Sequence, residues 1–568
     1  MAAHPLTVEA LAAWERRETE AAVSAAMAAH AQGVEGALVL ACSIALRGYR
    51  ADLLGGRVDD VVALPPGVLR DGVLAMMQIG RGDLRGAIMR MMPFVRDASL
   101  IADEAADPLA REGMLLPQLL SYLATGGVAS ASWTYARECI DAVRNLLARL
   151  ADEDSEAVTI PAYLSFDLLG LDAMVELHTH SGDRAHRALT EALAPLRMRN
   201  SLSSEHALAL IALGSVEHVR GHLGEAALNL ARGARLASLW RPGLRLHAEV
   251  ELAFVRIRQG RWRDATEVVR ATAASRTSIE HDWLEPQALS VHGLLLALRG
   301  DLAESAPVLE RAALLCRDTP AYLAQMVLTH ARIMVAITRS DWSGLRHTLM
   351  DASDPGYRHP YRPEEWRMLS MLAAWHLRRI DDLRAGLAEW KRSAGGQESS
   401  YYWAFLSILE EYDERYPAAD AAIGQARARM SLDDDPLGRA WVRIVAGIFY
   451  SRFGARGRPD PGRALAVYEE ASAELSELGA AGLAARYEQV VAETTADVLR
   501  TTRDVDPVAM LTEQQRRVAQ AVAQGYTSSE IAGILHLSKR TVDYHVANIM
   551  RRLGVSSRRE IGRAIAGA

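Results

Sequence analysis

The residues best suited to binding chemistry lie near the end of the chain, on one face of a predicted helix over residues 539–553. That face carries basic, hydrogen-bonding and small side chains: Lys539, Arg540, Asp543, Tyr544, Ala547, Asn548 and Arg551. The opposite face is apolar, with residues at spacings of four, three and four: Val542, Val546, Ile549 and Leu553. Phosphate oxygens attract cations, and base edges pair with polar groups. The pattern therefore predicts a helix that enters the major groove of double-stranded DNA.

Within this segment the side chains divide by what they can contact on DNA. We expect Asp543, Tyr544 and Ala547 to face the bases, because they lie at the centre of the polar face. We expect phosphate contacts from the residues around them: Lys539, Arg540, Asn548, Arg551 and Arg552. His545, on the same helix, is also expected to belong to the DNA-contacting set. Hydroxyl groups near two helix starts would assist: Thr527, Ser528, Ser538 and Thr541.

The elements that would position these residues are marked by helix-start signals. A hydroxyl residue followed three positions later by Glu or Gln forms a capping box. Three such pairs occur: Thr512 with Gln515, Thr527 with Glu530, and Ser557 with Glu560. Ser538 offers a fourth start through its hydroxyl alone. The small Ala532 and the short connection 535–538 suit a helix-turn-helix, so residues 508–568 are predicted to form a four-helix DNA-binding module.

This module resembles the LuxR-type helix-turn-helix family of bacterial transcription regulators. The matching positions are Leu511-Thr512, Gly525, Ile531-Ala532, Ser538, Thr541-Val542, His545, Arg552-Leu553-Gly554-Val555 and Arg558. The family usually has Glu where this chain has Gln515, which can serve the same cap. Asp543 occupies a groove-facing position that is often basic in the family, although a carboxylate can accept from a cytosine amino group. The resemblance covers about a tenth of the chain.

The resemblance also implies that two copies pair through the last helix. Ile561, Ala564 and Ile565 would form a small apolar strip for this contact. A homodimer predicts a promoter site with an inverted repeat, whose half-sites lie about 10 base pairs apart centre to centre. The competing interpretation is that the strip packs against Val518 and Val522 of the module's own first helix.

Charge is distributed unevenly between the module and the rest of the chain. Residues 508–568 hold nine Lys and Arg against four Asp and Glu, so 9 − 4 = +5, whereas the whole chain is −7 and the preceding residues therefore sum to −12. This division is expected if only the module meets phosphate, and the alternative is a solvated basic tail that caps the body. The polar segment 501–507 is the predicted linker. Charge attraction suggests that the body holds the module away from DNA until a small molecule or a partner releases it.

A short polar turn recurs before an alanine-rich helix through the middle of the chain. Turns of this kind begin near residues 182, 221, 260, 300, 340 and 380, at steps of 39 or 40 residues. The period predicts a tetratricopeptide-like solenoid of helical hairpins that bury their apolar faces against one another. The chain is therefore expected to be all-α, with an irregular helical region over 1–175, repeats over 176–500, a linker over 501–507 and the module over 508–568.

The repeat region is expected to sense a small ligand or a protein partner on its concave surface. Aromatic residues that could line such a surface are Tyr401, Tyr402, Trp403 and Trp441, although packing in the helical core is the favoured interpretation. The histidines around residues 178–222 lack the convergent ligands of a zinc site, and the three cysteines are interpreted as buried thiols. No metal or cofactor is expected.

The remaining patterns exclude several classes of protein. No phosphate-binding loop, nucleophile elbow or acidic metal cluster occurs, so we expect no enzyme. Charges in the first twenty residues argue against a signal peptide, and the uncharged stretch 113–136 is too polar to span a bilayer, so a cytoplasmic location is expected. Two lysines among 64 basic residues are typical of a GC-rich bacterial genome. The sequence thus predicts a DNA-binding transcription regulator; the alternative is a repeat scaffold for protein interactions whose last domain mainly dimerises.

Overall fold

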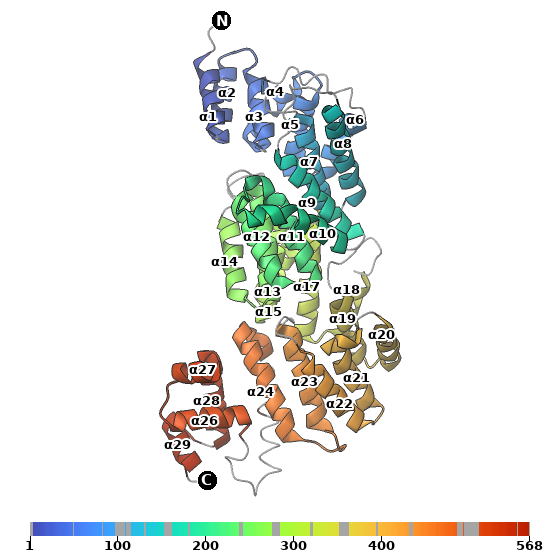
Figure 1. Ribbon diagram of the computed structural model, residues 1–568, viewed down its shortest axis with the longest axis vertical. Helices are drawn as coiled ribbons and strands as arrows, with labels where there is room; N and C mark the ends of the chain where they lie inside the picture. Colours follow the sequence, from blue (N-terminus) through green and yellow to red (C-terminus); the bar gives the residue numbers. More distant parts are fainter. Residues whose placement is uncertain are drawn as a thin grey trace.

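The fold was analysed in a computed structural model of the 568-residue chain. It describes residues 4–566 except 17, 49, 82, 97–107, 110–114, 130–131, 153–161, 180–181, 238–241, 275–283, 319–321, 352–362, 394–395, 431–435, 485–491, 493–510 and 554. The molecule is elongated, with the two ends of the chain at opposite ends of its long axis (Figure 1). The described residues form helices and their connections, which confirms the prediction of an all-α chain.

The N-terminal helices pack around one apolar core. They are α1 (Pro5–Glu15), α2 (Thr19–Ala31), α3 (Ala37–Arg47), η1 (Ala51–Arg57), α4 (Val58–Val62), α5 (Val68–Gly80), α6 (Leu84–Arg96), α7 (Leu115–Ala129) and α8 (Trp133–Asp152). Their buried residues, from Ala10 to Leu146, form one continuous cluster, which also includes residues of the helices that follow: Leu164, Leu168, Leu171, Val175 and Leu208. The irregular region and the array therefore share a core at their junction.

The central helices alternate in antiparallel pairs. They are α9 (Ala162–Thr179), α10 (Gly182–Met198), η4 (Ser204–His206), α11 (Ala207–Arg220), α12 (Leu223–Ala237), α13 (Pro242–Arg258), α14 (Trp262–Ala274), α15 (Glu285–Arg299), α16 (Leu302–Asp318), α17 (Tyr322–Arg339), α18 (Trp342–Asp351), α19 (Pro363–His376), α20 (Ile380–Arg392), η6 (Gly396–Glu398), α21 (Ser400–Tyr412), α22 (Tyr416–Ala428), α23 (Pro436–Arg452) and α24 (Pro461–Leu478). Each pair packs on the next, which confirms the predicted tetratricopeptide-like solenoid.

Left-handed residues end the first helix of six successive hairpins, and the first five of them lie close to predicted turns. Three are the glycines Gly221, Gly260 and Gly300, with φ of 83°, 74° and 89°. The next three hairpins use Ser340, Arg378 and Glu414 at φ of 56° to 58°. Glycine adopts this conformation without a steric cost, whereas other residues are disfavoured there. The period therefore sets where the chain turns, while the residue at the turn varies.

The last hairpin also packs against turns that are far away in the sequence. Leu475, Ala480 and Ala484 share one apolar core with α13, α15 and α17. A Cβ atom on Gly300 would lie 2.7 Å from the Cα atom of Gly482, so the two backbones meet where a side chain would not fit. The C-terminal end of α24 is thus seated on the middle of the array.

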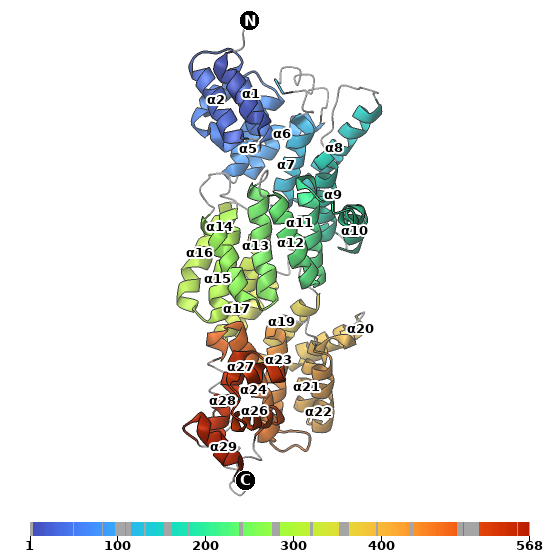
Figure 2. The same ribbon diagram turned by 60° about the vertical axis from the view of Figure 1, so that its left-hand side comes forward.

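The C-terminal module has four helices: α26 (Glu513–Ala523), α27 (Ser528–Leu535), α28 (Lys539–Leu553) and α29 (Arg558–Ala566). Its small core is formed by the predicted apolar faces, including Ile531 of α27 and the stripe Val542, Val546 and Ile549 of α28. The module lies beside α24 in both views (Figures 1 and 2), and α24 contacts α28. The predicted linker 501–507 lies outside the described residues.

Candidate nucleic-acid interface

The turn between α27 and α28 has the geometry that a helix-turn-helix needs. Thr527 and Glu530 form a full capping box at the start of α27. The helix ends at His536, whose φ of 54° reverses the chain. At the start of α28 the Thr541 amide donates to Ser538 Oγ over 3.0 Å. These caps satisfy amide groups that the helices cannot pair internally, and so they fix the angle between α27 and α28.

The first helix of the module is capped by Gln515 in place of the usual Glu. Its amide accepts from the Thr512 backbone N–H, while Thr512 Oγ1 accepts from the Gln515 N–H, which confirms the predicted capping box. The same side chain also accepts from Arg552 and donates to Glu469 of α24 over 2.5 Å. The amide oxygen of Gln515 therefore makes contacts within the module, while its amide nitrogen makes a contact to the body.

One polar face of α28 is open to solvent. Lys539, Arg540, Asp543, Ala547 and Arg551 are exposed, and Tyr544 is half-buried. These residues follow one another at helical spacing, so cations lie at the two ends of the face and the predicted base-reading residues lie between them. The arrangement matches what a major groove would meet, with phosphates at the rims and base edges at the centre.

A second polar face of α28 is buried. It consists of Thr541, His545, Asn548 and Arg552, whose exposed fractions are 7%, 8%, 2% and 6%. Their spacings of four, three and four make them a continuous stripe beside the apolar one. Burial and the nearby Arg552 lower the pKa of His545, which keeps this imidazole neutral. These four residues, all in the predicted DNA-contact set, are thus covered in this arrangement of the chain.

The cover at both ends of the stripe comes from α24. Glu469 forms an ion pair with Arg552 over 2.9 Å, and both side chains are almost fully buried. Eight residues further along α24, Glu477 accepts from Ser538 Oγ over 3.0 Å and from Thr541 Oγ1. Because Glu469 meets the end of α28 and Glu477 meets its start, the two helices run antiparallel to each other. The sequence reasoning missed both glutamates, since α24 carries several others with ordinary roles.

The other predicted contact residues lie at the start of α27. Thr527 is exposed, but its hydroxyl is used in the cap. Ser528 is buried and accepts from Arg558 Nη1 over 2.8 Å, while Arg558 Nη2 donates to the Tyr526 carbonyl. Arg558 therefore connects α29 to the start of α27. Both hydroxyl contacts to phosphate stay predictions.

The predicted dimer strip on α29 divides between the inside and the outside of the module. Ile561 is fully buried in the module's core together with Val518 and Val522, as the competing interpretation expects. Ala564 and Ile565 are half-buried and keep part of their surface exposed. Any pairing of two copies would therefore use the outer part of this strip.

The aromatic residues of the predicted ligand surface belong to a core of the array. Tyr401 and Tyr402 are 5% and 4% exposed, and Trp403 and Trp441 pack at the edge of the same cluster. Arg429 lies over the Trp403 ring at 5.0 Å. This placement favours the packing interpretation, and ligand binding at these residues stays a prediction.

The histidines and cysteines of the body are held by ordinary contacts. Glu217 pairs with His186 over 2.6 Å and with His222 over 2.5 Å, while His218 lies 3.3 Å from Glu251. Among the described residues no group of His, Cys, Asp and Glu could hold a metal ion. The three cysteines are buried, and burial raises the pKa of the Cys42 thiol to about 12. No helix in the described part of the chain is long and apolar enough to cross a membrane.

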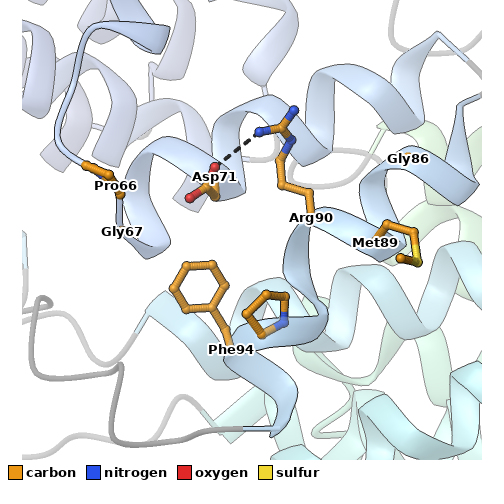
Figure 3. Close-up of a pocket in the computed structure, with 8 residues that line it drawn as sticks. Pro66, Gly67, Asp71, Gly86, Met89, Arg90 and Phe94 are labelled. Carbon is orange, nitrogen blue, oxygen red and sulfur yellow. Dashed lines mark hydrogen bonds and ion pairs between the residues drawn. The ribbon is translucent and has the colours of Figure 1, made fainter.

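A cavity that the sequence did not indicate lies between α5 and α6 (Figure 3). Its volume is about 600 Å³, and its apolar lining includes Met89, Pro93 and Phe94. Asp71 lies on its wall and is paired with Arg90 over 3.2 Å and with Arg70 over 3.0 Å. The two guanidinium groups share one carboxylate, and of the two only Arg90 lines this cavity, whereas Arg70 lines a neighbouring one.

Comparison with known proteins agrees with the geometry of the module. Residues 509–564 match the family of bacterial regulatory proteins called the luxR family, so the C-terminal module is a LuxR-type helix-turn-helix domain. The nitrate/nitrite response regulator protein NarP of Escherichia coli is 42% identical over 53 residues, which is 9% of this chain and 25% of NarP. The transcriptional regulatory protein UhpA of the same species is 49% identical over 53 residues, 9% of this chain and 27% of UhpA.

The matches to NarP and UhpA span about a quarter of the length of these relatives. Over nearly its whole length the chain is similar to a chain in the crystal structure of the APC/C hetero-tetramer Cut9–Hcn1, covering 99% of this chain and 96% of that one. The TM-score is 0.38 and the identity is 11%. A second similar structure is that of yeast Tom70, with a TM-score of 0.25 and 12% identity over 99% of this chain and 94% of that one.

Proposed function

We propose that the protein is a sequence-specific transcription regulator that binds promoter DNA through α28. The observation that carries this proposal is the exposed face of α28, where Arg540 and Arg551 flank Asp543 and Ala547 on a capped helix of a LuxR-type module. NarP and UhpA, each similar to 9% of this chain, are named as regulators. Asp543 would accept from a cytosine amino group, and the flanking cations would contact phosphates.

The test is to compare specific and random DNA. Genome-wide footprinting of the tagged protein first supplies a bound promoter. On that site Asp543→Ala is expected to lose about 1–3 kcal/mol of discrimination against the wrong base, with little change in affinity for random DNA. Equal losses on both kinds of DNA would contradict base reading by Asp543. If the wild-type chain prefers no sequence at all, the scaffold alternative is favoured.

We propose further that the protein binds as a homodimer, with Ala564 and Ile565 of α29 at the contact. Both side chains are half-buried, whereas Ile561 is already taken up by the core. Ala564→Glu should therefore shorten the footprint from two half-sites to one without unfolding the module. Ile561→Ala is the control for damage to the core, because it should lower stability rather than the number of half-sites. A full footprint with Ala564→Glu would exclude this contact.

We propose that the body senses a small anionic molecule, and that the cavity between α5 and α6 is where it binds. Because Arg70 shares the Asp71 carboxylate, the Arg90 guanidinium beside Met89 and Phe94 keeps capacity for a second anion, which suits an aromatic carboxylate. Benzoate is expected to raise the melting temperature of the full chain, whereas the uncharged benzamide should not. Arg90→Ala should abolish the benzoate effect. Equal shifts with both compounds, or a benzoate shift that survives Arg90→Ala, would rule out charge recognition there.

A further inference from the structure

We infer that α24 binds the recognition helix α28 in place of DNA, with the Glu477 carboxylate in the position of a backbone phosphate. The inference rests on the proposed function, since it assigns a role to the residues of α28 that DNA would otherwise contact.

The contacts of Glu477 are those of a phosphate at a helix start. Its carboxylate accepts from both Ser538 Oγ and Thr541 Oγ1, at the amino end of α28. Hydroxyl groups and the positive end of a helix dipole form a typical site for phosphate oxygens. An anion already occupies this site in the docked chain. A DNA phosphate and Glu477 therefore cannot bind there together.

The other end of the contact uses a charge that DNA would also use. Arg552 is 6% exposed and is paired with Glu469, which is 3% exposed. A guanidinium held by a buried carboxylate cannot neutralise a phosphate. Because α24 runs antiparallel to α28 along this stripe, Glu469 and Glu477 hold both of its ends at once. Each carboxylate occupies a group of α28 that would otherwise contact phosphate.

The middle of the contact is polar and incompletely paired. The buried His545 Nδ1 and Asn548 Nδ2 have no hydrogen-bond partner among the described residues. Buried polar atoms without partners weaken a contact, so these two add no strength to the part of the contact that lies between Glu469 and Glu477.

Gln515 fits the docked state better than a glutamate would. Its amide nitrogen donates to Glu469, and its oxygen accepts from Arg552 and from the Thr512 N–H. A carboxylate at this position would keep the cap but would place a second negative charge beside Glu469. The substitution Gln515→Glu is therefore expected to loosen docking while leaving the module folded.

The main experiment measures affinity of the full chain for its promoter in variants of α24. Glu477→Gln removes a charged acceptor from docking and changes no residue of the module. The apparent Kd for DNA should fall about ten-fold, since a hydrogen bond to a charged group is worth about 1.5–3 kcal/mol and 1.4 kcal/mol is a factor of ten. Glu469→Gln and Gln515→Glu should act in the same direction.

The matched control is Glu470→Gln, on the same helix and with the same change of charge. Glu470 is 46% exposed as a side chain and pairs with Arg427 and Arg443 of the body, not with the module. DNA affinity should stay as in the wild type if docking matters, whereas it should rise like that of Glu477→Gln if only the net charge matters. The latter result would overturn the inference.

A second measurement reports docking without relying on affinity. Ala473 lies one turn from both glutamates on α24 and is 8% exposed. A cysteine there (Ala473→Cys) should react slowly with a maleimide in the docked chain and at least ten-fold faster once promoter DNA or Glu477→Gln displaces α28. The native cysteines are buried and should contribute little background.

The outcomes separate the two proposals. If promoter DNA binds but leaves the labelling rate unchanged, α24 and DNA do not compete, and the inference fails while the proposed function stands. If neither the wild type nor any variant binds a specific site, the proposed function fails. In that case Glu477→Gln can still change labelling, but the contact would be a structural interface rather than a substitute for DNA.

Discussion

Arg551 and Arg552 are neighbours in the chain, yet their surroundings give them different roles. Arg551 is exposed at the rim of the open face of α28, whereas Arg552 is buried and paired with Glu469. A residue free to meet phosphate should contribute to the counterions released on binding. A residue already paired must first exchange its partner.

We therefore expect Arg551→Ala to weaken binding to all DNA sequences alike. The slope of log K against log salt should become shallower by about one unit, because one fewer phosphate is neutralised. Arg392→Ala, an exposed cation at the end of α20, is the charge-matched control and should leave the slope unchanged. An unchanged slope in Arg551→Ala would remove this residue from the interface.

His178 gives a prediction about acid stability. It is 5% exposed and stacks on Trp133 at 4.3 Å, and burial lowers its pKa from 6.5 to about 4. The unfolded chain therefore binds more protons between these values, so stability falls as the pH drops through this window. Going from pH 7 to pH 5 should cost about 2 kcal/mol through this group.

The measurement is the loss of thermal stability between pH 7 and pH 5 in the wild type and in His178→Asn. The variant keeps a polar side chain of similar shape but cannot titrate, so its loss should be smaller by roughly that amount. His347, which is exposed at the surface of α18, provides the control: His347→Asn should lose as much stability as the wild type. Identical losses in all three proteins would contradict a neutral, buried His178.

At the scale of single residues, the sequence predicted local contacts within one helix turn better than it predicted which residues are covered by distant parts of the chain. Capping pairs such as Thr527 with Glu530 could be found because both partners lie within one turn of helix. Helical spacing also separated the apolar stripe of α28 from its polar residues. It could not show that Thr541 and Arg552 are covered, because the cover comes from Glu469 and Glu477, more than sixty positions earlier in the chain.

At the scale of elements, the helical hairpin is the unit that the sequence specifies. Its turns could be predicted because they repeat and because glycine marks the left-handed residue in three of them. What could not be predicted is where the hairpins meet again. The packing of α24 on α13 and α15 depends on the accumulated curvature of the array, which no local pattern encodes.

This meeting point leads to a prediction about Gly300. Replacing it with alanine would put a side chain at a φ of 89° and 2.7 Å from the Cα atom of Gly482. The left-handed conformation alone costs about 1–2 kcal/mol for a residue with a Cβ atom, and the contact adds to this. We expect Gly300→Ala to lower the melting temperature of the full chain by several degrees.

The control for Gly300→Ala is Gly224→Ala in α12, where nothing lies within 4 Å of the added Cβ atom. Alanine favours helix there, so this variant should be as stable as the wild type or more so. A second consequence is specific to Gly300: if α24 shifts, the contact between Glu477 and Ser538 should loosen, and promoter affinity should rise. A stable Gly300→Ala chain would show that the two backbones can separate freely.

At the scale of the whole molecule, binding to DNA and docking to the body are both electrostatic, so salt acts on both. Added salt weakens the contact of the module with phosphate, and it also weakens the attraction between a body of −12 and a module of +5. The two effects oppose each other in the observed affinity. The wild-type chain should therefore show a shallower salt dependence than its DNA contacts alone would give.

Glu477→Gln should make the salt dependence of the affinity steeper. In this variant a smaller fraction of the chains is docked, so added salt releases fewer modules and offsets less of the loss of phosphate contacts. The measurement is the promoter affinity of the full chain between about 50 and about 300 mM salt, a range that includes physiological ionic strength. Glu470→Gln should keep the wild-type slope. Parallel lines for the wild type and Glu477→Gln would mean that docking carries no salt-dependent part.

The contact between Gly300 and Gly482 also determines how far a disturbance can travel. Two backbones that touch directly have no side chain between them that could change rotamer and absorb a shift. Gly482 follows the end of α24 by four residues, and Leu475 of α24 lies in the same core as α15, so a change in superhelical pitch at α15 is expected to move the end of α24 that carries Glu477. The affinity of the module for DNA would then depend on the curvature of the array. Any molecule that binds across two hairpins and changes this curvature would change the affinity for the promoter.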